Sequence, residues 1–289
     1  MPGCRHDRTG TSCREQASSL GRRIPLKRNN AEPHPDGGKQ LRILLVSDLH
    51  YTLPQLDWVV KVANDFDLVV LAGDTLSIRS AVPLAAQPVV ITEYLSMLQS
   101  STHVVLSSGN HDLTGPDPQG EQSALWLSEV RSLGIPTDAD SLELGDALVT
   151  VCPWWDGPLG RERVAAQLAA DLGRRPARWL WVYHWPPIGS PTSWTGRREY
   201  GDPDLRDWIE AHQPDAVFTG HVHEAAFKPD GAWADRIGRT WVFNAGNQIG
   251  RVPAHVVIDL TEGQATWVSM LGAETVDLGS ASVPARSVF

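Results

Sequence analysis

The sequence predicts an α/β protein in which a parallel β-sheet with covering helices is followed by a second sheet. In the first half, short apolar runs that suit buried strands alternate with helix-like stretches, which is the order of strand–helix–strand units. From residue 139 onward shorter strands dominate, so we expect a second sheet that packs face to face on the first. Apolar residues make up 42% and charged residues 20% of the chain, which excludes collagen, coiled coil and wholesale disorder.

Three strands are predicted in the first half, each from a short apolar run. The run Leu41-Arg-Ile-Leu-Leu-Val46 ends at Ser47-Asp48, as a buried strand would. Helix-like stretches follow each run and provide the crossovers that parallel strands require. We expect strands at 41–46, 67–71 and 103–106, and helices at 54–64, 88–100 and 121–133.

The second half continues with short apolar runs and two further helix-like segments. Runs of this length, separated by polar and glycine-containing turns, are typical of strands in a sheet. We expect helices at 160–171 and 204–211, and strands at 147–151, 179–183, 215–219, 239–244, 254–259 and 264–269.

A single domain over residues 41–271 is expected, because no repeat, low-complexity tract or linker interrupts that range. Residues 1–40 carry eight basic and four acidic residues and few large apolar ones, so we expect a disordered N-terminal extension. A basic arm that contacts nucleic acid is the alternative interpretation of this segment. Residues 272–289 are expected to form a loose C-terminal tail.

Charge and cysteine content restrict the class of protein and its setting. The formal net charge of −9 argues against a general nucleic-acid coat protein, because such a surface repels phosphate backbones. The chain has only three cysteines, which implies no disulfide framework and favours a reducing, cytoplasmic setting. No apolar stretch approaches the length of a membrane span, and no secretory signal is evident, so we expect no membrane partner.

Polar clusters rich in Asp, Asn and His follow five of the predicted strands. Ligands bind beyond the carboxyl ends of strands in open α/β sheets, so these segments should deliver their side chains to one crevice. In an extended backbone residues two apart point the same way, so Asp48 and His50 can share one metal, and His221 and His223 aim at one locus. Asp, Asn and Gly are common where strands end, because they suit turns. Turn formation does not explain why four histidines also lie at the ends of strands. The clusters are Asp48-Leu49-His50, Gly73-Asp74, Gly109-Asn110-His111-Asp112, Tyr183-His184 and Gly220-His221-Val222-His223.

Together these clusters resemble the motifs of the calcineurin-like metallophosphoesterase superfamily, over roughly residues 41–260. The resemblance implies two packed β-sheets flanked by helices, a four-layer α/β/β/α sandwich. It also implies hydrolysis of phosphomonoesters or phosphodiesters by in-line attack of a metal-bound hydroxide. Asn244-Ala245-Gly246 resembles a segment that often follows the last ligands in this family. One metal would be held by Asp48, His50, Asp74 and His223, and a second by Asp74, Asn110, His184 and His221.

The implied chemistry requires these residue types. Two divalent cations about 3.5–4 Å apart repel each other and need a bridging carboxylate, the role implied for Asp74, and a bridging hydroxide. Two cations, two aspartates and one hydroxide leave a net +1, so an acidic chain can hold a locally positive pocket. The ligands suit Mn, Fe or Zn, so the identity of the metals stays open. His111 would be the catalytic residue that stabilises or protonates phosphoryl oxygens, and Asp112 would orient it and favour its imidazolium form.

Three loops, at 75–88, 113–120 and 186–204, are expected to border the pocket and to select a small phosphorylated substrate. Trp194, Arg197 and Arg198 in the last loop are candidate substrate-binding residues, for a stacked nucleobase and a second phosphate. The alternative is that Trp194 packs the loop and the arginines lie in water, which is the commoner case.

Two other functions stay open for such a sequence. One is a nuclease acting on DNA or RNA, which the acidic composition and the lack of a basic stripe argue against. The other is a non-catalytic metal-binding scaffold for partner proteins, but every expected ligand position is filled here, which favours the enzyme. The oligomeric state is not predicted.

Overall fold

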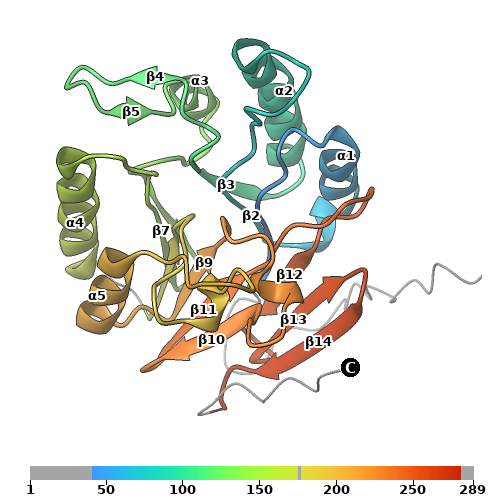
Figure 1. Cartoon of the computed structure of the whole chain (residues 1–289), viewed down its shortest axis with the longest axis vertical. Coiled ribbons are helices and arrows are strands. Elements are labelled where there is room, and N and C mark those ends of the chain that lie inside the picture. Colours follow the sequence, from blue (N-terminus) through green and yellow to red (C-terminus); the bar gives the residue numbers. More distant parts are fainter. Residues whose placement is uncertain (1–40, 175–176, 281–289) are drawn as a thin grey trace, which may run out of the picture. The chain divides into compact units, whose positions relative to one another are not determined.

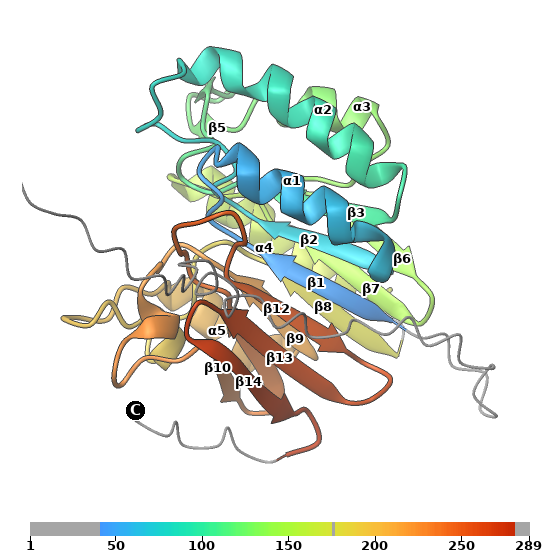
Figure 2. The ribbon, with the colours of Figure 1, turned by 90° about the vertical axis from the view of Figure 1, so that its right-hand side faces the viewer.

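The computed structural model describes residues 41–174 and 177–280 (Figure 1). The predictions for residues 1–40 and for the end of the chain from residue 281 lie outside this range. Two six-stranded sheets form the centre of the described part, and helices cover their outer faces (Figure 2). The predicted α/β architecture with two packed sheets flanked by helices is therefore confirmed.

Sheet 1 has the strand order β14-β13-β12-β1-β2-β3. Its strands β1, β2 and β3 are parallel, as predicted, whereas the three C-terminal strands are antiparallel. Assigning the last two predicted strands to the second sheet was wrong, because β12 pairs with the free edge of β1, with Ile43 opposite Ile258. The strands are β1 (Arg42–Val46), β2 (Leu68–Ala72), β3 (His103–Ser107), β12 (His255–Asp259), β13 (Gln264–Ser269) and β14 (Gly272–Asp277).

The predicted loose tail is wrong for residues 272–277. These residues form β14, an edge strand that pairs with β13 from Gly272 opposite Ser269 to Asp277 opposite Gln264. Four of its six residues are exposed and Val276 is its only large apolar residue, so no apolar pattern in the sequence marks it as a strand. Its one buried side chain, Val276, packs into the core between the sheets.

Sheet 2 has the order β10-β11-β9-β8-β7-β6, and its four central strands are parallel. The two outer strands were not predicted and pair antiparallel at the edges. The strands are β6 (Ser141–Leu144), β7 (Ala147–Val151), β8 (Arg178–Val182), β9 (Ala216–Thr219), β10 (Ala234–Ile237) and β11 (Thr240–Asn244).

In residues 41–174 and 177–280, five α-helices lie on the outer faces of the sheets. Three of them begin with proline at the first or second position, where its missing N–H costs nothing. A fourth, which begins at Pro203, is also capped by the Asp202 carboxylate, which accepts a hydrogen bond from the Asp204 amide. The helices are α1 (Leu53–Val62), α2 (Gln87–Gln99), α3 (Leu127–Ser132), α4 (Pro158–Leu172) and α5 (Pro203–His212), with 3₁₀ turns η1 (Ala63–Asp65), η2 (Leu84–Ala86), η3 (Pro191–Ser193) and η4 (Ala225–Phe227).

The predicted helix at 121–133 is only half right. Its first part contains β5 (Gln122–Ser123), which pairs with β4 (Gly115–Pro116), and only its second part forms α3. None of the helices in the described ranges is long and apolar enough to cross a membrane.

Alternating side chains in β1 explain the layering. Ile43 and Leu45 face sheet 2 in the core between the sheets, whereas Leu44 and Val46 face the core beneath α1, α2 and α3. A third core lies between sheet 2 and helices α4 and α5. Because both faces of β1 are covered, the strand is apolar from Ile43 to Val46, and polar residues follow where it ends.

Candidate metal centre and active site

The carboxyl ends of β1, β2 and β3 from sheet 1 meet those of β8 and β9 from sheet 2. Four residues at these ends adopt left-handed backbone conformations, with φ of +55° at Asp48, +46° at His50, +53° at Asp74 and +66° at His221. Non-glycine residues in this region are strained by about 1–3 kcal/mol each, and such strain concentrates at functional sites. The amide of His50 donates to the Asp74 carbonyl at 2.9 Å, which helps to hold the turn.

The extended-backbone argument for pairs of ligands two residues apart is therefore wrong. Asp48 and His50 do meet, but through a turn with two left-handed residues. His221 and His223 diverge into two different side-chain groups, as the family resemblance implied.

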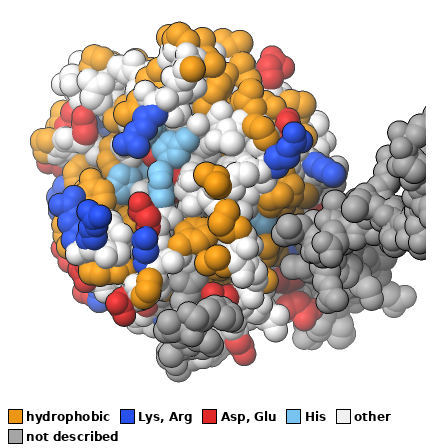
Figure 3. Space-filling model, turned by 45° about the vertical axis from the view of Figure 1, so that its right-hand side comes forward, with side chains coloured by type: hydrophobic (Ala, Val, Ile, Leu, Met, Phe, Trp, Pro, Cys, Tyr) orange, Lys and Arg blue, Asp and Glu red, His pale blue; other side chains and the backbone are white. Residues whose placement is uncertain are grey.

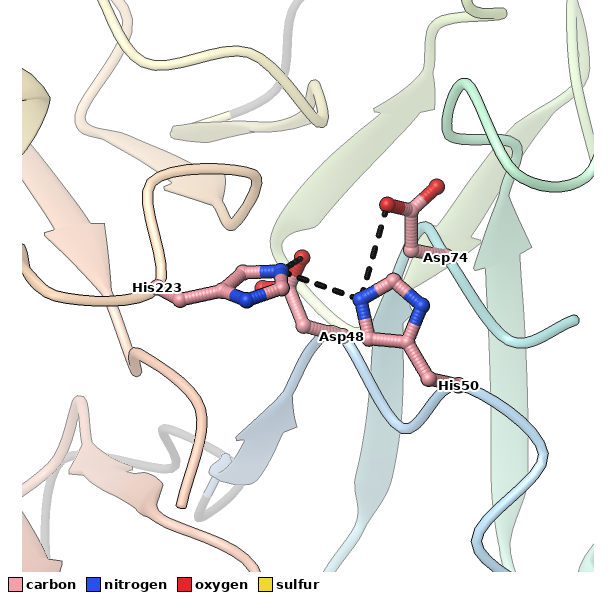
Figure 4. Close-up of side chains that lie close together, drawn as sticks. All are labelled: Asp48, His50, Asp74 and His223. Atoms are coloured by element: carbon pink, nitrogen blue, oxygen red, sulfur yellow. Dashed lines mark hydrogen bonds and ion pairs between the residues drawn. The ribbon is translucent and has the colours of Figure 1, made fainter. Parts of the chain in front are cut away.

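The first group contains Asp48, His50, Asp74 and His223, whose ligand atoms lie within 4.8 Å of one another (Figure 4). His223 Nε2 lies 3.2 Å from Asp48 Oδ1, and His50 Nε2 lies 3.8 Å from Asp74 Oδ2. The two imidazole Nε2 atoms of His50 and His223 face each other at 3.0 Å. Two imidazole nitrogens and two carboxylates that converge in this way form a donor set suited to a divalent transition metal.

The second group contains Asp74, His184 and His221, again within 4.8 Å of one another, so Asp74 belongs to both groups. Two buried atoms of this group, His184 Nε2 and His221 Nε2, have no hydrogen-bond partner in the described part of the chain, and the same holds for Asn110 Oδ1, whose residue lines the same cavity as His221. Burying unpaired polar atoms is costly, and a metal ion bound by the group would satisfy the two imidazole nitrogens. His184 Nδ1 lies 2.7 Å from the Ala72 carbonyl, so it carries a proton and leaves the Nε2 lone pair for the metal. The residues of each group therefore have the donor atoms that metal binding requires.

Both aspartates are ionised at neutral pH. Burial by itself would raise the pKa of Asp48, but the imidazoles of His223, His184 and His50 hold that pKa well below its usual range. Burial likewise opposes ionisation of Asp74, and His184 outweighs it, so the pKa of Asp74 is also lowered. Burial lowers the pKa of His221 to about 3, which keeps this imidazole neutral and able to ligate.

We expect the affinity for the second metal ion to rise with pH. Although burial opposes its charge, the carboxylates of Asp74 and Asp48 raise the pKa of His184 to about 9, so the metal-free site holds a proton there at pH 7. A metal must displace that proton, so the association constant should rise about tenfold per pH unit from pH 7 and level off above pH 9. Calorimetric titration of metal-free protein in buffers of different ionisation enthalpy measures both the affinity and the released proton. An affinity that stays constant over this range would contradict the prediction.

His111 and Asp112 follow β3, but they do not interact as predicted. The Asp112 carboxylate is buried and accepts hydrogen bonds from the Leu76 and Gly109 amides, each at 2.8 Å. Burial raises its pKa to about 7. Asp112 therefore joins the β2 and β3 loops rather than orienting His111, because its oxygens face backbone amides.

The imidazole of His111 is positioned by the loop after β2. Its Nδ1 accepts a hydrogen bond from the Ile78 amide at 3.4 Å, which leaves the proton on Nε2. The His111 amide donates to Asp74 Oδ1 at 2.8 Å, so the residue is tied to the centre of both metal groups. Burial lowers the pKa of His111, so the ring is neutral at pH 7 and offers one N–H donor.

A cavity of about 590 Å³ opens over the two groups. The loop at 75–88 borders it, as predicted, through Ser77 and Arg79, whereas the loops at 113–120 and 186–204 do not contribute to its lining. A fourth segment, 247–250, lines the cavity and was missed. It directly follows Asn244-Ala245-Gly246, which is the signal that could have identified it.

The three predicted substrate-binding residues, Trp194, Arg197 and Arg198, do not line this cavity. Arg198 lies over the ring of Tyr200 at 5.4 Å, and Tyr200 stacks on His221 with ring centroids 5.2 Å apart. The loop therefore reaches the metal centre through Tyr200, which was not among the residues predicted from the sequence.

The chain is similar to known proteins both in sequence and in structure. The sequence profile of the calcineurin-like phosphoesterase family matches residues 41–225. A search of curated proteins finds no significant match. The protein TT1561 of Thermus thermophilus has a similar structure, with a TM-score of 0.54, 17% identity, and coverage of 83% of this chain and 100% of that one. A putative 5'-nucleotidase from Staphylococcus aureus in complex with alpha-ketoglutarate gives a TM-score of 0.51 and 14% identity, and the match covers 86% of this chain and 56% of that one. At these identities the structures support the fold alone.

Proposed function

The chain belongs to the calcineurin-like phosphoesterase family, and from this premise we propose that it hydrolyses phosphomonoesters or phosphodiesters with two divalent metal ions. Members of this family are metal-dependent enzymes, and residues that could bind a metal are present here. The observation that carries the proposal of two ions is the set of three buried, unpartnered atoms, Asn110 Oδ1, His184 Nε2 and His221 Nε2, beside the Asp48 and His223 group.

The protein side chains set the charge and the geometry of the reaction. When bound, the two ions would supply Lewis acidity and lower the pKa of water towards neutrality. Only two of the seven proposed ligands are anionic, so the loaded site stays positive and attracts a phosphoryl group although the chain has a net charge of −9. Arg79 lines the same cavity and is exposed, so its guanidinium is available to a phosphoryl oxygen. Mn, Fe and Zn all suit this ligand set.

Replacing His111 with glutamine should leave the metals bound and lower turnover. The neutral imidazole can donate a hydrogen bond from Nε2 to a phosphoryl oxygen and stabilise the charge that develops there, and removing one such donor lowers the rate by about 10²–10³-fold. The measurement is kcat on an aryl phosphate together with metal content by elemental analysis. Loss of bound metal in the variant would mean that His111 is a ligand. His103→Gln, at the opposite end of β3, is the matched control.

The proposed function is tested by reconstituting metal-free protein with Mn, Fe or Zn and assaying 4-nitrophenyl phosphate and bis(4-nitrophenyl) phosphate. Metal-dependent release of nitrophenol from either ester supports the proposal, and the ratio of the two rates distinguishes monoesterase from diesterase activity. No hydrolysis of either ester with any metal would refute it. A panel of nucleotides, sugar phosphates and simple diesters then narrows the substrate.

We also propose a small substrate rather than DNA or RNA, and a cytoplasmic site of action. The acidic composition supports the first point, because long polyanions need several basic contacts. The sparse cysteines support the second; among the described residues Cys152 is a free, buried thiol.

A further inference from the structure

A group of exposed apolar side chains lies next to the cavity. Ile249 is 84% exposed, which is the largest value for any large hydrophobic residue in the described ranges. Leu271, Met270 and Val252 are 64%, 59% and 41% exposed. We call these four residues the apolar lip. Hydrophobic side chains adjoin the group of histidines on the surface in Figure 3.

Three residues of the apolar lip, Ile249, Val252 and Met270, line a groove of about 300 Å³. Gln248, Ile249 and Gly250 line both this groove and the catalytic cavity, so the two lie directly beside each other. The far side of the groove is formed by Pro253, Val268 and Met270, and its exposed lining is mostly apolar. A long apolar substituent on a phosphate ester in the cavity therefore has an apolar surface within reach on the other side of this shared segment.

Hydrogen bonds hold the groove in a fixed shape. The Gln248 side chain donates to the Val252 carbonyl and accepts from the Met270 amide, each at 2.8 Å, so it joins the two loops that carry the apolar lip. The buried Gln55 side chain of α1 donates to the carbonyls of Gln248 at 2.8 Å and Gly250 at 3.2 Å. Preformed sites bind with less loss of conformational entropy than flexible loops do, which favours a ligand-binding role.

The groove is also tied directly to the proposed metal ligands. Asn247, one residue before the shared lining, donates through its side-chain amide to the Asp48 carbonyl. Its backbone amide donates to the His223 carbonyl at 3.2 Å. The distance between the metal centre and the groove is therefore fixed, as it must be if one substrate occupies both.

We infer that this enzyme acts on phosphate esters with an alkyl or acyl chain, and that the groove bordered by the apolar lip binds the chain. The inference rests on the proposed phosphoesterase function, since it places the phosphoryl group over the metal ligands. Exposed apolar patches beside polar catalytic groups mark binding sites for ligands that have a polar head and an apolar body. Burial of each methylene strengthens binding, so chain length should determine the efficiency of hydrolysis.

The test is a series of butyl, hexyl, octyl and decyl phosphates, with the matching alkyl 4-nitrophenyl phosphates as diesters, all below their micellar concentrations. We expect kcat/KM to rise about two- to fourfold for each added methylene until the groove is filled. Ile249→Ser and Met270→Ser should flatten this dependence. Val89→Ser is the matched control, because Val89 is 66% exposed on α2 and lines neither the groove nor the cavity.

Binding of non-hydrolysable alkylphosphonates, measured by calorimetry, gives a readout that does not depend on turnover. The dissociation constant should fall with chain length in the parent protein, with a negative heat-capacity change, and much less in Ile249→Ser. Hydrolysis that is independent of chain length would overturn the inference and leave the proposed function intact. Chain-dependent phosphonate binding without any hydrolysis would support the groove and refute the proposed function. A flat series in which Ile249→Ser converts a dimer to a monomer would identify the apolar lip as a subunit contact instead.

Discussion

Replacing Asp74 with asparagine is expected to lower kcat by about a thousandfold or more and to remove bound metal. Asp74 is the residue common to both ligand groups, and its side chain is buried between His184 and His50. Asparagine keeps the size of the side chain but removes the charge that offsets the repulsion between two cations. A shared carboxylate of this kind contributes several kcal/mol, which corresponds to the expected loss of rate.

Elemental analysis and steady-state kinetics on the same preparation test this expectation. The matched control is Asp207→Asn, since Asp207 is exposed on α5 and belongs to neither group. Circular dichroism should show that the variant is folded, because the layers are held by three apolar cores. Full metal content and unchanged kcat in Asp74→Asn would refute the proposed centre.

Replacing Gly109 with alanine should disrupt the same centre without removing a ligand. A Cβ at this position would lie 2.2 Å from Asp74 Oδ1 and 2.7 Å from His184 Nε2, far inside van der Waals contact. Because Asp74 and His184 are buried, neither can move away freely, so the ligand set must be distorted. We expect the affinity for metal to fall about 10–100-fold and the free energy of unfolding to fall by about 1–3 kcal/mol.

Gly173→Ala is the control for this substitution. The nearest atom to a Cβ at Gly173 would be the Ala170 carbonyl oxygen at 3.8 Å, which is ordinary contact. Metal titration and denaturant unfolding of the two variants separate a defect at the site from a general loss of stability. If Gly109→Ala binds metal as tightly as the parent protein, the prediction is wrong, and the close packing against Gly109 does not determine the positions of the ligands Asp74 and His184.

Local sequence patterns predict the strands well but do not show which strands pair. The runs at 254–259 and 264–269 were recognised as strands, but their place in sheet 1 depends on the pairing of β12 with β1, more than 200 residues away in the chain, and of β13 with β12. Register of this kind is a property of contacts between distant segments. The edge strand β14 escaped prediction for another reason, since its exposed polar residues leave no periodic apolar signal.

In the candidate site, too, local motifs could be predicted, whereas contacts between distant segments could not. The seven proposed metal ligands could be named from sequence because they lie in motifs after strands, and because those motifs resemble the ones of the metallophosphoesterase superfamily. The partners of Asp112 could not, because they are backbone amides, which every residue carries. The groove beside Ile249 could not be predicted either, because it depends on how the loops after β11 and β13 lie against each other.

The proposed ligands come from both sheets. Asp48, Asp74 and Asn110 follow strands of sheet 1, whereas His184, His221 and His223 follow strands of sheet 2. Metal ions bound here would link the two sheets. Part of their binding free energy would therefore add to the free energy of unfolding of the whole domain. The lifetime of the folded enzyme would then depend on the supply of free metal around it, as well as on its own sequence.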